Sequence, residues 1–161
     1  MIRALFIALV FVTPLVAAER NSPLPSDSTL VAAAKAYPGV RFHEGLRDPL
    51  LVRLAQDYSE QMAAIDSQSK GWGRRRIGHF GWDARSATIR KQLGLRGVEV
   101  SAESWDRQTN ALMPEIGRTM FESWQASSGH WRVVSTKHKR FGDGLAKSRR
   151  GIWYAAVIVA D

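Results

Sequence analysis

Residues 152–160, near the end of the chain, are apolar at every position and read Ile-Trp-Tyr-Ala-Ala-Val-Ile-Val-Ala. Their β-branched and aromatic side chains favour a β-strand. A strand with one face in water alternates apolar and polar residues, whereas this segment presents apolar side chains to both faces. The sequence therefore predicts a central strand that is covered by helices on both sides.

Two further segments are candidates to pair with this strand. Residues 141–146 form a shorter run, and the polar segment 147–151, which ends in Gly151, joins them to the final strand. Two such runs with a short glycine-containing connection predict a β-hairpin. Residues 98–100, Val-Glu-Val, are a candidate third strand.

The clearest helix begins at Asp48 and Pro49, an acidic N-cap followed by proline at the first helical position. Its apolar residues recur at helical spacing, which places them on one buried face. They are Leu51, Leu54, Ala55, Tyr58, Met62 and Ile65.

Three more helices follow from local signals. Ser28 is a candidate cap for a short helix, and Asp83 for a helix over residues 84–93 that Gly94 closes. The third spans about residues 110–125, with apolar residues on one stripe. Helices combined with a small antiparallel sheet predict an α+β fold, arranged as a three-layer α/β/α sandwich.

The first residues predict export. A basic start, an apolar run over residues 4–16 and the small residues Ala17 and Ala18 are typical of a cleaved secretory signal, which we assign to residues 1–18. Residues 19–27 are polar and contain two prolines, which indicates a flexible leader. Residues 28–161 then form one domain. The chain has no cysteine, so this domain has no disulfides and depends on its core.

The chain carries a net charge of +8. Such a charge favours anionic partners, and for a secreted or periplasmic protein these are lipids or anionic envelope polymers rather than nucleic acid. A basic surface that only maintains solubility is the alternative. The apolar run is short and contains a proline, so we expect no stable membrane anchor. The oligomeric state does not follow from the sequence.

His79 and His130 stand in glycine-containing segments, and Glu103 lies between them in the sequence. Imidazoles and a carboxylate bind divalent metals or transfer protons near neutral pH, so these residues are the candidate site. The other two histidines, His43 and His138, have polar and charged neighbours and are expected at the surface.

Arg85 is four residues before Ile89 and eight before Leu93, so it shares the inward stripe of its helix. A buried arginine needs a carboxylate partner, and we expect Glu103 or Asp83 in that role. The alternative is an arginine whose stem lies along the surface while its guanidinium reaches water.

Four segments in this order resemble the CAP superfamily, also called the SCP or pathogenesis-related-1-like domain, in a compact bacterial form. They are the helix with Leu54-Ala55 and Met62-Ala63, His-Phe-Gly-Trp-Asp-Ala-Arg at residues 79–85, Ala-Glu-Ser at 102–104, and Trp-Gln-Ala-Ser-Ser-Gly-His at 124–130. A glycine pair at residues 142 and 144 before the last strand is also similar to the family pattern.

The resemblance implies an α-β-α sandwich with a surface cavity where His79, Glu103, Arg85 and His130 meet. In some family members such a cavity binds zinc, and the matching metal ligands here are His79 and His130. The chain departs from the family at Ser127, where a second acid is expected, and at Ser104, where an asparagine is usual. Two imidazoles and one carboxylate form an open site, so a bound ion and a metal-free hydrogen-bonded arrangement both stay open.

No known catalytic motif is present, which makes a binding or interaction role the leading hypothesis over an enzyme. The first alternative is a metal-assisted hydrolase for peptide or glycan, with Glu103 as the candidate catalytic base. The second is a basic structural protein attached to anionic envelope polymers, whose binding would weaken with salt.

Overall fold

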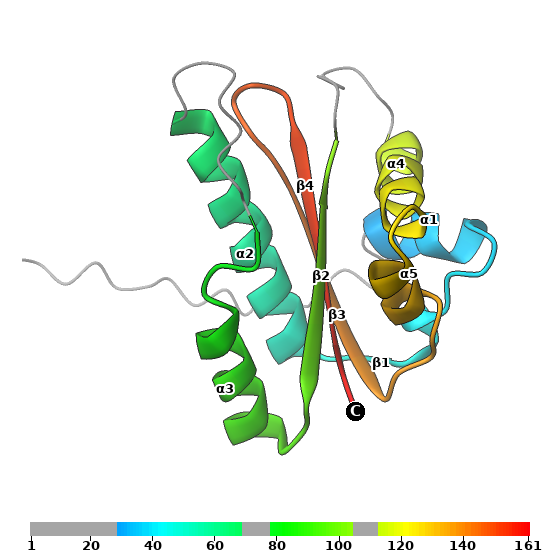
Figure 1. Ribbon diagram of the computed structural model, residues 1–161, viewed down its shortest axis with the longest axis vertical. Helices are drawn as coiled ribbons and strands as arrows, with labels where there is room; N and C mark the ends of the chain where they lie inside the picture. Colours follow the sequence, from blue (N-terminus) through cyan, green and yellow to red (C-terminus); the bar gives the residue numbers. More distant parts are fainter. Residues whose placement is uncertain (1–28, 69–77, 105–112) are drawn as a thin grey trace, which may run out of the picture.

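A computed structural model describes residues 29–68, 78–104 and 113–161. Figure 1 shows a sheet seen on edge between two layers of helices. The elements are α1 (Thr29–Ala36), the 3-10 helix Phe42–Glu44, β1 (Leu46–Arg47), α2 (Pro49–Gln68), α3 (Trp82–Leu93), β2 (Gly97–Glu103), α4 (Met113–Gln125), α5 (Ser128–Val134), β3 (Arg140–Lys147) and β4 (Trp153–Ala160). The α+β class and the three layers agree with the sequence analysis.

The sheet has four strands in the order β1-β3-β4-β2. β4 pairs antiparallel with β3, which confirms the predicted hairpin, and also antiparallel with β2, which contains the candidate third strand. β1 pairs parallel with β3. The sheet is therefore mixed, where a small antiparallel sheet was expected, and the parallel part is limited to the short pair of β1 and β3. The physical reason is β1 itself, a two-residue strand ahead of α2 that carries no sequence signal of its own.

β4 is central and buried along almost its whole length. Its odd-numbered residues, with Val100 and Phe141, pack against α1, α4 and α5, while its even-numbered residues pack against α2 and α3. Two separate apolar cores thus lie on opposite faces of the sheet. This arrangement explains why residues 152–160 show no polar alternation.

α2 lies directly against β3 because two glycines remove the side chains between them. A Cβ atom built on Gly142 or Gly144 would lie within 2.5 Å of the α2 backbone at Leu51 and Ala55. The start of α2 is fixed by Asp48, whose carboxylate accepts hydrogen bonds from the amides of residues 50 and 51. This pair of contacts holds α2 in register over the sheet.

One helix begins at a different residue from the predicted one, and another was not predicted. α3 begins at Trp82 after Gly81, which has a φ of 72°, so Asp83 lies in the first turn and is not the cap. α5, which no sequence signal indicated, follows α4 after a break of two residues. Within the described residues, no helix is long and apolar enough to cross a membrane. The predicted signal and leader, residues 1–27, lie outside the described part.

Candidate functional site

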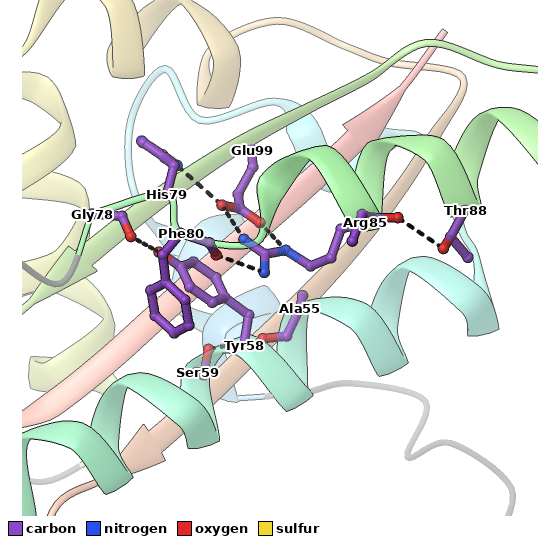
Figure 2. Close-up of polar contacts among 10 residues, drawn as sticks. Ala55, Tyr58, Ser59, Gly78, His79, Phe80, Arg85, Thr88 and Glu99 are labelled. Carbon is purple, nitrogen blue, oxygen red and sulfur yellow. Dashed lines mark hydrogen bonds and ion pairs between the residues drawn. The ribbon is translucent and has the colours of Figure 1, made fainter.

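The candidate site is built around a buried carboxylate on β2. The whole residue Glu99, backbone included, is 7% exposed, and its Oε1 lies 3.0 Å from Nδ1 of His79. The imidazole of His79 comes from the turn before α3, and its side chain is 44% exposed. A fixed carboxylate thus orients a histidine ring that itself remains accessible to solvent. Figure 2 shows the contact between Glu99 and His79.

Arg85 holds this carboxylate in place from α3. Its Nε donates to Oε2 of Glu99 at 2.7 Å, and its Nη2 donates to Oε1 at 2.8 Å. The side chains of Arg85 and Glu99 are 10% and 1% exposed, so this is a buried, bidentate ion pair. The inward orientation predicted for Arg85 is confirmed, but both predicted partners were wrong, because the carboxylate is Glu99.

Two neighbouring groups also contact the guanidinium of Arg85. Its guanidinium carbon lies 3.9 Å from the centre of the Tyr58 ring, and its Nη1 donates to the carbonyl of Phe80. The Tyr58 hydroxyl donates to the carbonyl of Gly78, which ties α2 to the turn that carries His79. Burial, followed by the nearby charge of Glu99, raises the pKa of Tyr58, so this hydroxyl keeps its proton at neutral pH.

His130 reaches the same place from the opposite layer. It belongs to α5, which covers the other face of the sheet, yet its ring centre lies 6.2 Å from that of His79. The two imidazoles meet beside β2, an outer strand of the sheet. Burial, and then the proximity of His79, lower the pKa of His130, so its ring is neutral and able to accept a hydrogen bond or a metal at pH 7.

An open pocket of about 300 Å³ adjoins His79. Trp82 and Val98 give it apolar walls, and Gly97 and Glu99 from β2 complete its lining. Gly97 also lets α3 pack closely on β2, because a Cβ there would lie 2.8 Å from the Ile89 side chain and 3.2 Å from Trp82. The pocket combines an apolar surface with one oriented imidazole, a combination typical of small ligand sites.

Glu103 does not join this cluster. It lies on the same face of β2 as Glu99, but four residues further along a strand, a separation of about 13 Å. Its neighbour across the sheet is Tyr154, whose pKa is raised first by burial and then by the charge of Glu103. The sequence offered a signal for the correct acid, since Glu99 alternates with Val98 and Val100 in a predicted strand that Arg85 faces.

The side chains at the site do not form a complete zinc site. Both oxygens of Glu99 already accept hydrogen bonds from Arg85, and one also faces His79, so Glu99 orients an imidazole and is not placed as a ligand. Across the described residues, no group of three His, Asp or Glu side chains is arranged to hold a metal. Two imidazoles fall short of the three or four protein ligands that hold zinc firmly.

The remaining histidines lie away from the site. His138 was expected at the surface, but its side chain is only 10% exposed and contacts Asp161 and the carbonyl of Val133. His43 is half-buried, and its Nδ1 has no hydrogen-bond partner among the described residues. Burial, partly offset by the charge of Glu44, lowers the pKa of His43.

Comparison with known proteins gives no match, either to a family model or to a curated protein.

Proposed function

We propose that the chain is an exported, CAP-like binding domain of the cell envelope or the extracellular space. Its ligand binds in the pocket beside His79 and His130, and the ligand class includes lipids and anionic envelope polymers. The proposal draws on the order of the four CAP-like segments and on the secretory character of residues 1–18. The α/β/α sandwich is compatible with it.

One observation carries the proposal. His79 and His130 come from opposite helical layers and approach to 6.2 Å beside an open pocket, while Glu99 and Arg85 fix the orientation of His79. A buried ion pair that orients one exposed imidazole costs desolvation energy and is not needed to close a small core. Such an arrangement is useful when the free nitrogen of that imidazole must meet a ligand.

The chemistry available at the pocket is hydrogen bonding, apolar contact and weak metal binding. Nε2 of His79 has no partner among the described residues, and Trp82 supplies an aromatic wall. A supplied divalent ion such as zinc would bind the two imidazoles and complete its coordination with water or a ligand. Zinc is therefore a suitable probe of whether the two rings act together.

Calorimetric titration of the full chain with zinc tests this arrangement. We expect saturable one-site binding in the wild type and its loss in both His79→Ala and His130→Ala. His43→Ala is the matched control, because it removes an imidazole elsewhere and should leave binding unchanged. Zinc binding that survives loss of either ring, or no binding in the wild type, would contradict converging imidazoles.

A metal-assisted or general-base hydrolase is the second candidate, favoured by the contact between Glu99 and His79. A carboxylate that fixes one imidazole nitrogen prepares the other to take a proton from water. The sequence hypothesis gave the role of base to Glu103, and the two assignments are separable. Loss of hydrolysis of a peptide or glycan substrate in His79→Gln alone supports His79 as base, whereas loss in Glu103→Gln alone supports Glu103.

A further inference from the structure

The two edges of the sheet differ in whether their outward backbone groups are hydrogen-bonded. The outer side of β3 is covered at both of its ends: β1 and the Asp48 amide pair with it at Phe141, and the Gln56 side chain bonds both the amide and the carbonyl of Leu145. The side-chain amide of Gln56 thus occupies the position of a further strand. A covered edge of this kind cannot accept another chain.

β2 forms the opposite edge. Arg96 and Asp161 exchange both backbone hydrogen bonds, and the Ser104 amide bonds the Trp153 carbonyl, so the even-numbered residues of β2 face β4. The amides and carbonyls of the odd-numbered residues therefore point outward. The Ser101 carbonyl accepts the indole hydrogen of Trp124, but no described residue bonds the outward groups of Gly97 and Glu99.

An exposed apolar side chain lies within this open stretch. Val98 is 47% exposed and is one of the three exposed large apolar residues of the described chain. Val98 also lines the pocket with His79 and Trp82. An extended segment paired with the outward groups would place alternate side chains toward Val98 and this pocket.

The charged residues near Gly97 indicate which kind of segment could bind at this edge. Arg96 precedes Gly97, and Arg90 and Lys91 stand in the last turn of α3; all three are exposed. Two nearby acids are already paired: Glu99 with Arg85, and Asp161, which lies opposite Arg96, with His138 and the Lys139 amide. The exposed acid of α3 is Asp83. A second copy of the chain would bring the same cations against each other, whereas an acidic segment would be attracted.

We infer that the edge of β2 at Gly97 and Glu99 binds an extended, acidic peptide segment of a partner protein by strand addition. One side chain of that segment enters the pocket lined by His79, Trp82 and Val98. The inference rests on the proposed binding function and assigns its ligand class. Two backbone residues give the pairing, and the pocket gives the side-chain selectivity.

The test uses a random decapeptide library displayed on phage and selected on the full chain. Selected peptides should be acidic, and N-methylation of one alternating set of their amides should weaken binding by about tenfold or more, the effect of two lost hydrogen bonds, while the other set has little effect. Binding should slow hydrogen exchange at the amides of Gly97 and Glu99. The Val98 amide, already bonded within the sheet, should not change.

A charge-reversal pair provides the matched control. Arg96→Glu should weaken binding about threefold to fivefold, the size of an exposed ion pair, and Arg53→Glu on α2 should have no effect at the same change in net charge.

Failure to select any binder, equal effects of both N-methylated sets, or unchanged exchange at Gly97 and Glu99 would overturn the inference. Protection of these amides through self-association, seen as a dimer in sedimentation, would replace the peptide with a second copy. Zinc binding by His79 and His130 would then still support the proposed function, so the two failures are distinguishable.

Discussion

Two histidine–carboxylate pairs in this molecule have opposite arrangements. In the pair of His79 and Glu99 the imidazole is 44% exposed and the carboxylate 1% exposed, whereas in the pair of His138 and Asp161 the values are 10% and 56%. His138 uses both ring nitrogens, one toward Asp161 and one toward the Val133 carbonyl. His79 uses one. A buried carboxylate that orients an exposed imidazole is an arrangement suited to ligand binding. A buried imidazole with two acceptors stabilises the fold.

The largest effect is expected from Glu99→Gln. The substitution keeps the shape but leaves the buried guanidinium of Arg85 without a compensating charge. Loss of one partner of a buried ion pair typically costs about 3–5 kcal/mol, and we expect a decrease of that size in the free energy of unfolding measured with denaturant. Asp83→Asn, an exposed acid two residues from Arg85, is the control. Equal, small effects of both substitutions would show that the buried pair does not stabilise the fold.

The next largest effect separates the two histidines. His138→Ala removes two hydrogen bonds from a buried ring and leaves the Val133 carbonyl without its donor, so we expect a loss of about 1–3 kcal/mol in the free energy of unfolding. His79→Ala truncates an exposed ring, and we expect less than about 1 kcal/mol. Zinc binding should show the reverse order. A destabilisation by His79→Ala as large as that by His138→Ala would remove the distinction.

The sequence predicted the scaffold better than the site. Periodicity and caps placed α2, α4, β3 and β4 within a few residues, because their apolar patterns are long and report burial directly. β1 and α5 are two and seven residues long, too short for periodicity to indicate them.

The site acid was misassigned for a different reason. The sequence suggested that Arg85 needed a carboxylate, and the structure supplied one, but the choice among Asp83, Glu99 and Glu103 depends on which β2 residues face α3. That orientation follows from the pairing register of β2 with β4, in which a shift of one residue reverses every side chain. His138 was misplaced for the same kind of reason, since its burial depends on the end of β4, where Asp161 lies beside it.

A third prediction concerns pH and His130. Its pKa in the folded protein is lowered, first by burial and then by His79, below the ordinary value of 6.5. The folded state therefore resists protonation, and the stability that this ring contributes is fully present above pH 6.5 and is lost as the pH falls through the folded pKa. The free energy of unfolding, measured from pH 8 to pH 5, should fall less steeply in His130→Gln than in the wild type. Zinc binding should weaken over the same range, since a protonated imidazole is not a ligand.

The smallest effect is expected from substitution of Asp161, the exposed carboxylate in the pair of His138 and Asp161. Partial burial alone would raise the Asp161 pKa, but hydrogen bonds from His138 and from the Lys139 amide outweigh it and lower the pKa below 3.8. The contribution of this carboxylate is therefore present above pH 3.8 and is lost as the pH falls through the folded pKa. Water screens a side chain that is 56% exposed, so Asp161→Asn should cost only a few tenths of a kcal/mol at pH 7 and nothing in strong acid. A cost that equals that of His138→Ala would mean that Asp161 alone holds His138 and that its hydrogen bond to the Val133 carbonyl does not stabilise the fold.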